Sequence, residues 1–274
     1  MCTERGELDV TAVEAGIAGT AFAGRISHVV STGSTNALAL EAAQSGARIG
    51  VWVAEEQTAG RGRGGHGWHS AAGEGLYVSA LIAPSLPMTM ALWLSLATGL
   101  AARSAIAEVT GLAADIRWPN DLLLHGRKCG GILVETAMAP ARDEKEAMLR
   151  YAVIGVGINV NHAVFPAELA ALATSLRMES GSGVSREALL AALLRSLDGE
   201  IVSLVREYRG EPGVAGLLER FSWASSWVLG RQVSVDEAGG YTGVTAGLDE
   251  RGFLLVNGDD GVMHTVLSGG VRER

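Results

Sequence analysis

The 274-residue sequence has two cysteines, and it lacks both a signal-peptide pattern and an apolar run of membrane-spanning length. Two isolated cysteines, Cys2 and Cys129, predict no disulfide framework and fit a cytoplasmic location. The N-terminus is acidic and has no apolar core of the kind that a secretion signal needs. The most apolar stretch, residues 88–102, contains threonine and serine and is shorter than the roughly 20 residues of a membrane helix. It therefore predicts a buried core helix, and no membrane partner is expected.

The sequence also has fewer positively charged residues than acidic ones. Lysine and arginine number 22 against 30 acidic residues, which gives a net charge of −8 and a pI of about 5.3. Such a chain does not attract nucleic acid through its general field, so any phosphate site must be built locally. The histidines show no metal-ligand spacing. With 48% apolar residues, the composition predicts a folded core rather than disorder.

Hydrophobic periodicity predicts an alternation of helices and strands followed by a small β module. A long amphipathic helix is expected at 186–208 and the apolar helix at 88–109, with shorter helices at 34–46 and 213–221. Near-continuous apolar strands are expected within residues 49–54, 76–83, 115–124, 130–136 and 151–160. The near-continuous apolar character of the last two of these is typical of a sheet covered on both faces or of strands at its centre. After Ser225, four short β runs with Gly/Asp turns predict an antiparallel barrel of about 50 residues.

The composition of one segment is not explained by packing in a hydrophobic core. AEEQTAGRGRGGHGWHS, residues 54–70, places five glycines among two arginines and two histidines. Ordering glycine is entropically costly and burying arginine is costly too, so a packed core gains nothing from this composition. The segment is either a slack surface loop or a loop that closes over an anion. Two arginines and freely approaching backbone N–H groups would suit a carboxylate or a phosphate.

This loop is one of several motifs that occur together in order. They are STGSTN at 31–36, the loop itself at 54–68, RWPNDLLLHGRKCGGILVE at 117–135 and GVGINV at 155–160. Each alone has an ordinary interpretation as a helix cap, a surface loop, a tight turn or a glycine-containing strand. Together they resemble the biotin protein ligases over roughly residues 25–161, and the C-terminal β module matches as well.

The resemblance implies a fold and an activity. The fold is α/β (α+β), with a mixed central sheet and helices similar to the class II aminoacyl-tRNA synthetase catalytic domain in residues 1–225. A small SH3-like β-barrel would follow in residues 226–274. The implied enzyme makes biotinyl-5′-AMP from biotin and ATP with magnesium. It then transfers biotin to a lysine of a biotin carboxyl carrier protein, and a homodimer is compatible with the family.

Site residues follow from the matched motifs. The catalytic set is Lys128, Arg63 and Asp121, and magnesium is expected to arrive with ATP near Asp121, without a direct metal signature. The biotin-binding set is Ser34, Thr35, Asn36, Gln57, Gly60, Arg61, Gly62, Arg63, Lys128, Gly131, Gly155 and Gly157. The nucleotide-binding set is Arg63, His66, Trp68, Asn120, Lys128 and Asn159. Cations suit this chemistry because adenylation brings a phosphate next to a carboxylate.

The sequence departs from the family at three places. Gly64 and His66 stand where the family loop commonly has arginine, and Arg117 replaces a common lysine. Histidine is mostly neutral at pH 7, so we expect weaker retention of the adenylate or a larger share for Arg61 and Arg63. Guanidinium keeps the charge of lysine but has a different geometry.

Other functions must be weighed against this one. A lipoate or octanoate ligase of related fold would need an apolar acyl tunnel, whereas Gln57, Ser34 and Thr35 suit a polar ureido head group. A biotin-responsive repressor would need a helix-turn-helix domain, yet only about 25–30 residues precede the first motif, which favours the short form. A catalytically idle carrier-binding module would be expected to lack Lys128 or Arg61, and both are present.

Overall fold

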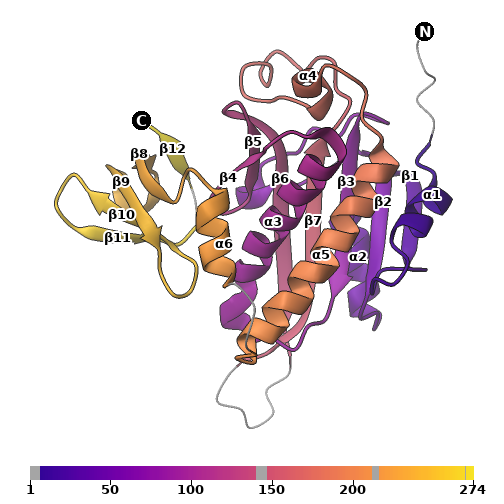
Figure 1. Ribbon diagram of the computed structural model, residues 1–274, viewed down its shortest axis with the longest axis horizontal. Coiled ribbons are helices and arrows are strands. Elements are labelled where there is room, and N and C mark those ends of the chain that lie inside the picture. Colours follow the sequence, from indigo (N-terminus) through magenta and orange to yellow (C-terminus); the bar gives the residue numbers. More distant parts are fainter. Residues whose placement is uncertain (1–6, 140–146, 212–215, 269) are drawn as a thin grey trace.

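A seven-stranded mixed sheet forms the centre of the molecule. The computed structural model describes residues 7–139, 147–211, 216–268 and 270–274 (Figure 1). The sheet order is β1-β2-β3-β7-β6-β5-β4; β1 and β2 are parallel and every other pair is antiparallel. Its strands are β1 (Ile26–Thr32), β2 (Gly50–Gln57), β3 (Gly75–Ile82), β4 (Asp115–Arg117), β5 (Asp121–Leu124), β6 (Arg127–Met138) and β7 (Leu149–Asn159). The predicted mixed sheet is confirmed.

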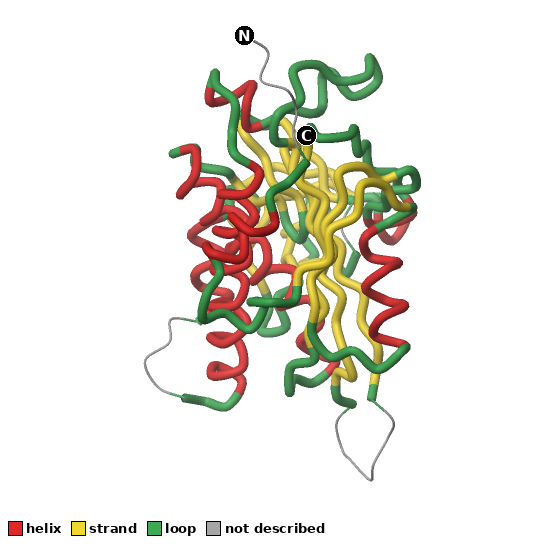
Figure 2. The backbone as a smooth tube through the Cα atoms, turned by 90° about the vertical axis from the view of Figure 1, so that its right-hand side faces the viewer, coloured by secondary structure: helices red, strands yellow, loops and turns green. Residues whose placement is uncertain are grey.

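Helices cover both faces of this sheet, as the apolar strands predicted. Helices α3 (Ala91–Thr110) and α5 (Arg186–Tyr208) pack together on one face, and α2 (Thr35–Gln44) lies on the other (Figure 2). Strand β3, next to the central strand β7, is buried at every position. Two buried clusters result, a large one on the α3/α5 side and a small one beneath α2. The remaining helices are α1 (Val10–Gly16), α4 (Leu176–Ser180) and α6 (Leu217–Ala224).

The most apolar stretch is a core helix, as expected. Residues Met88–Thr110 are long and apolar enough to cross a membrane by length and composition, but 61% of that window is buried inside the fold. Its polar side chains are satisfied internally, because Thr98 donates to the carbonyl of Leu94 and Ser95 donates to that of Pro119. Gly111 ends the helix with a φ of 73°, a conformation that glycine adopts without strain.

The C-terminal module is a five-stranded antiparallel sheet in the order β11-β10-β9-β8-β12. Its strands are β8 (Leu229–Val235), β9 (Tyr241–Leu248), β10 (Leu254–Gly258), β11 (Met263–Val266) and β12 (Val271–Glu273). The sequence predicted four strands and missed β12, which has three residues and buries only Val271. The module packs on the domain that contains the seven-stranded sheet. Trp118 donates its indole N–H to the carbonyl of Gly252 at 2.9 Å, and Trp93 donates its indole N–H to the carbonyl of Arg251.

Three further elements were not predicted: α1, β1 and α4. Strand β1 lies at the edge of the sheet, and Val30 is 59% exposed, so its pattern carries no clear apolar period. The helix expected at 213–221 begins at Leu217, and part of its predicted start lies outside the described residues. Cys129 is free and buried, and Cys2 falls outside the described residues.

Candidate active site

The motif side chains meet in a cleft at one end of the central strands. Ser34, Thr35 and Asn36 stand at the start of α2, and Gln57 ends β2. Together with residues of β6 and β7 they line about 450 Å³ of empty space, the open mouth included. Every residue in the predicted biotin-binding set lines this cleft except Gly60, which lies just beside it against Ser70 and Gln57.

A buried polar network supports the closed end of the cleft. Gln57 Oε1 accepts hydrogen bonds from the backbone N–H and the hydroxyl of Thr35, at 2.9 and 3.1 Å. The Ser79 hydroxyl lies 2.7 Å from Thr35 Oγ1 and 2.5 Å from Asn36 Oδ1, and Ser79 is 0% exposed. Asn36 Nδ2 donates to Glu135 at 2.8 Å. These bonds orient the side chains that face the cleft. Sequence reasoning missed Ser79 and Glu135, because a lone serine or glutamate in a strand carries no local signal.

The glycines of β6 and β7 make room for protein side chains. A Cβ on Gly157 would lie 2.6 Å from the indole Nε1 of Trp68, and one on Gly131 would lie 3.2 Å from the same ring. A Cβ on Gly155 would lie 2.3 Å from Asn36 Oδ1. The absent Cβ atoms therefore let Trp68 and Asn36 lie flat against the strands. Direct contact between these glycines and biotin stays a prediction.

The glycine-rich loop forms a tight hairpin instead of an extended segment. Arg61 and Gly67 form an isolated antiparallel β-bridge, and the N–H of Gly62 donates to the carbonyl of His66 at 2.7 Å. Between them, residues Arg63–Gly65 form one 3-10 turn. Gly64 has a φ of 68° and Gly65 a φ of 80°, so glycine is required by the backbone at both positions. The departure from arginine at position 64 thus fits this turn.

The two loop arginines both line the smaller cleft but have different surroundings. Arg61 is half exposed and forms an ion pair with Glu135 at 3.2 Å. Nη1 of Arg63 is buried and has no hydrogen-bond partner within the described residues. Burial lowers the pKa of Arg63, while the carboxylates of Glu237 and Asp121 oppose that shift. A guanidinium stays charged at neutral pH, so Arg63 offers an anion a charged donor inside the protein.

A second and larger cavity lies beside the cleft. It holds about 2030 Å³ of empty space, its open mouth included, and lies between the domain of the seven-stranded sheet and the C-terminal module. All six predicted nucleotide-binding residues line it: Arg63, His66, Trp68, Asn120, Lys128 and Asn159. Four of them, Arg63, Trp68, Asn120 and Lys128, line the first cleft as well, as does Gly62. A ligand in each space would therefore meet at these shared side chains.

Lys128 enters this shared wall from β6. Its ammonium forms an ion pair with Asp121 Oδ1 at 2.5 Å, and Arg117 binds the other oxygen of that carboxylate. Lys128 Nζ also lies 5.4 Å from the centre of the Trp68 ring, within cation–π range. The adjacent Cys129 is no candidate nucleophile, because burial raises its pKa to about 12 and keeps the thiol protonated.

The donor set does not form a protein-held metal site. Within the described ranges, no group of three or more histidine, cysteine, aspartate or glutamate side chains could hold a metal ion. Among the described residues that line the larger cavity, Asp121 is the one carboxylate, and it already has two cationic partners. Magnesium near Asp121 therefore stays a prediction, and it would depend on oxygens brought by a nucleotide.

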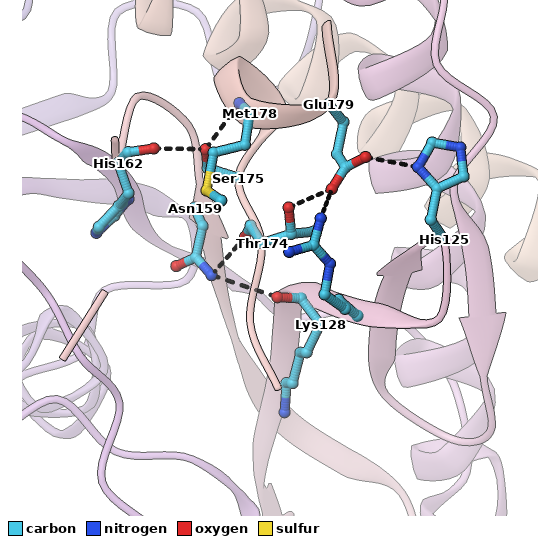
Figure 3. Close-up of polar contacts among 9 residues, drawn as sticks. His125, Lys128, Asn159, His162, Thr174, Ser175, Met178 and Glu179 are labelled. Atoms are coloured by element: carbon cyan, nitrogen blue, oxygen red, sulfur yellow. Dashed lines mark hydrogen bonds and ion pairs between the residues drawn. The ribbon is translucent and has the colours of Figure 1, made fainter. Parts of the chain in front are cut away.

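Asn159 and Asn120 form hydrogen bonds with backbone carbonyl groups of the site. Asn159 is 4% exposed and donates from Nδ2 to the carbonyl of Thr174 at 3.0 Å and to that of Lys128 at 3.5 Å (Figure 3). Asn120 donates from Nδ2 to the carbonyl of Ile132 at 3.1 Å. Both amides therefore hold strands that carry the cationic and glycine positions. Nucleotide contact by either residue stays a prediction.

Comparison with known proteins places this fold and site in a class. Residues 29–159 match the model of the biotin/lipoate A/B protein ligase family. Residues 228–271 match the biotin protein ligase C-terminal domain. The first match spans the glycine loop, Lys128 and the strands that line the cleft, and the second spans most of the five-stranded module.

Individual relatives narrow the class. The chain is 34% identical over 257 residues to the biotin–[acetyl-CoA-carboxylase] ligase of Mycobacterium tuberculosis, covering 88% of this chain and 86% of that protein. It is 33% identical to the bifunctional ligase/repressor BirA of Bacillus subtilis, covering 84% and 68%. A biotin protein ligase from Aquifex aeolicus, solved in complex with biotin and ATP, is 27% identical with a TM-score of 0.74, covering 92% and 99%. The chain belongs to the biotin protein ligases.

Proposed function

We propose that the protein is an ATP-dependent biotin–protein ligase, which makes biotinyl-5′-AMP and transfers biotin to a lysine of a biotin carboxyl carrier protein. The observation that carries this proposal is the shared wall of the two cavities, which includes Arg63, Trp68 and Lys128. Biotin in the smaller cleft would direct its carboxylate toward this wall. A nucleotide in the larger cavity would bring its phosphates to the same place. The solved relative in complex with both biotin and ATP supports the binding of these two ligands by this fold.

The first step joins the two ligands. An oxygen of the biotin carboxylate attacks the α-phosphorus of ATP, the bond to the bridging oxygen breaks and pyrophosphate leaves. Negative charge gathers where the carboxylate approaches the phosphate. Lys128 and Arg63 would stabilise this charge in a partly desolvated wall, where charge-assisted hydrogen bonds are strong. Asp121 would orient Lys128 through their ion pair.

The second step uses the adenylate as an activated acyl group. The amine of the acceptor lysine attacks the acyl carbon, the bond to the phosphate oxygen breaks and AMP leaves with the electron pair. The amine gives up one proton as the amide forms. Until the carrier arrives, the glycine-rich loop with Arg63 would retain the adenylate. A carrier with an exposed lysine is the partner that this chemistry requires.

A lipoate or octanoate ligase of related fold is the alternative. The lining of the cleft argues against it, because the polar side chains of Ser34, Thr35, Asn36 and Gln57 line it. A purely aliphatic acyl chain would separate these groups from water and offer them no hydrogen bond beyond those they already make to neighbouring residues, which costs free energy. A ureido ring offers both donors and acceptors to match them.

Intact-mass measurement of carrier domains tests the proposal. The protein is incubated with ATP, magnesium and either biotin or octanoate, and with a biotin carboxyl carrier domain or a lipoyl domain. We expect one biotin to be added to the biotin carrier, and neither carrier to be modified with octanoate. Octanoylation of the lipoyl domain, without biotinylation, would support the alternative. The cytoplasmic location, the homodimer and the lack of a nucleic-acid partner stay predictions.

A further inference from the structure

The loop between β7 and α4 forms one wall of the larger cavity. Its residues Phe165, Leu169 and Leu172 line that cavity, whereas no residue of 162–175 lines the smaller cleft. The ends of the loop are tied together, because the Ser175 hydroxyl donates to the carbonyl of His162 at 2.7 Å (Figure 3). The loop thus contributes to one cavity alone.

The end of this loop pairs directly with the backbone of Lys128. The N–H of Lys128 donates to the carbonyl of Leu172 at 2.8 Å, and the N–H of Thr174 donates to the carbonyl of Lys128 at 2.9 Å. Ala173 therefore forms a parallel bridge with Lys128. Asn159 reinforces the pairing from β7 by donating to the carbonyls of Thr174 and Lys128. Displacing this end of the loop would move both the cavity wall and the backbone of Lys128.

A carboxylate from α4 fastens the two paired segments together. Glu179 accepts hydrogen bonds from Thr174, at the end of the loop, from Arg127 at 2.6 Å and from His125 at 2.5 Å (Figure 3). Arg127 and His125 belong to the hairpin that leads into Lys128. The Glu179 side chain is 8% exposed. Burial alone would raise its pKa, but the bonds from Thr174 and His125 and the charge of Arg127 lower it, so Glu179 is ionised at neutral pH.

We propose that Glu179 is a positioning residue for the nucleotide, which holds the 162–175 loop against the backbone of Lys128. This inference rests on the proposed function, because it takes the larger cavity as the ATP site. The Lys128 side chain points away from Glu179, so the carboxylate acts through the loop and the backbone and touches neither ligand (Figure 3). Loss of its charge would loosen the wall of the ATP cavity and leave in place the side of the biotin cleft formed by Thr35, Asn36 and Gln57, which the loop does not line.

Glu179→Gln is the direct test, since it keeps the shape of the side chain and removes the charge. We expect the Kd for a non-hydrolysable ATP analogue and the KM for ATP to rise about tenfold, the loss expected when a charged hydrogen-bond acceptor becomes neutral. The Kd for biotin, measured by calorimetry, is expected to change less than about twofold. Hydrogen exchange across 162–175 should become faster in the variant.

Glu200→Gln is the matched control. Glu200 is 15% exposed and binds Arg220 through two hydrogen bonds of 2.6 and 2.9 Å, between α5 and α6 and away from both cavities. We expect this variant to leave the Kd for the ATP analogue unchanged. Thr174→Val removes one bond to Glu179 and keeps the carboxylate, so it decides the question if Glu179→Gln does not fold. It should weaken binding of the ATP analogue by about threefold and spare biotin.

The outcomes separate this inference from the proposed function. A folded Glu179→Gln protein with unchanged affinity for the ATP analogue would overturn the inference, as would an equal loss for biotin and the analogue. Unchanged analogue binding by Thr174→Val would overturn it as well where Glu179→Gln does not fold. If the unmutated protein binds the analogue but forms no adenylate with biotin, the proposed function fails while the binding comparison still tests Glu179.

Discussion

At the scale of single residues, Lys128 links the two cavities most directly. Its ammonium faces both spaces and is held by Asp121, and its backbone is bridged to Ala173. We predict that Lys128→Met slows adenylate formation by on the order of a hundredfold without unfolding the protein, because the methionine keeps the packing length and removes the charge. The loss should be about 3 kcal/mol of transition-state stabilisation, similar to removing one oxyanion donor. Pyrophosphate release near the normal rate would show that Lys128 has no catalytic role.

Ser79 provides a second test at this scale. One buried hydroxyl contacts both Thr35 and Asn36, so its removal should let both side chains shift in the biotin cleft. We predict that Ser79→Ala raises the Kd for biotin about tenfold and leaves the Kd for an ATP analogue unchanged. Thr98→Val is the control, because it removes another buried hydroxyl, which donates to the carbonyl of Leu94 in its own helix. Equal effects of the two variants on biotin would rule out a specific role for Ser79.

The glycines show where sequence reasoning reached its limit for single residues. Resemblance identified Gly131, Gly155 and Gly157 as site positions, and they do line the cleft. The side chains that lie where the Cβ atoms of these glycines would point are those of Trp68 and Asn36, which are distant in sequence. Such a steric relation depends on tertiary packing, and no local pattern encodes it. Ser79 and Glu135 were missed for the same reason.

At the scale of elements, the glycine-rich loop has one position that can accept arginine and one that resists it. His66 has a φ of −68°, an ordinary extended conformation, whereas Gly64 has a φ of 68°. We predict that His66→Arg strengthens retention of the adenylate and reduces stray biotinylation of bystander lysines. Gly64→Arg should not, because a side chain in the left-handed region costs about 1 kcal/mol. Mass spectrometry of a bystander protein measures the leak, and an equal benefit from both variants would contradict this account.

Long, strongly apolar elements could be predicted, and short or edge elements could not. Strands β3 and β7 are buried along most of their length and helix α3 along half of it, so they are continuous apolar runs, and helix α5 buries one face with leucines at helical spacing. Strand β1 is half exposed at the sheet edge, and α4 has five residues. Helix α4 is held by tertiary bonds such as those of Glu179. Its importance for the site was therefore not visible in the sequence.

At the scale of the whole molecule, Glu55 joins three distant segments. It accepts hydrogen bonds from the N–H of Leu8 at 2.7 Å, from His28 in β1 at 2.8 Å and from Arg186 in α5. Burial alone would raise the pKa of Glu55, but the bonds from Leu8, Arg186 and His28 outweigh burial and lower it. A carboxylate with a lowered pKa contributes stability above its unfolded pKa of about 4.3, and that contribution is lost as the pH falls further.

Glu55→Gln should therefore reduce both stability and its dependence on acid. We predict a fall of about 3 kcal/mol in the free energy of unfolding at pH 7, because the carboxylate that binds buried Arg186 is removed. Below about pH 4 the difference between the two proteins should shrink. Glu108→Gln, at an exposed ion pair with Arg195, is the control and should change little. Urea titrations at several pH values give both quantities, and a constant difference at all pH values would refute the assignment.

The sequence did not predict how the domain of the seven-stranded sheet and the C-terminal module pack together, although the sequence of each resembled the family. The larger cavity exists because the C-terminal module packs on the Trp118 segment and contributes Ser268 and Arg272 to the wall. Contacts of this kind join residues more than a hundred positions apart, as Trp118 and Gly252 show. The nucleotide-binding set could be named from motifs, whereas the shared wall between the cavities required the fold.

The central claim is that biotin and ATP react with each other at the wall that includes Arg63, Trp68 and Lys128. Biotin-dependent exchange of labelled pyrophosphate into ATP tests it most directly, because it needs no carrier protein. We predict exchange that requires biotin and is slowed by on the order of a hundredfold in Lys128→Met. Exchange that proceeds equally without biotin, or that survives intact in Lys128→Met, would contradict the account.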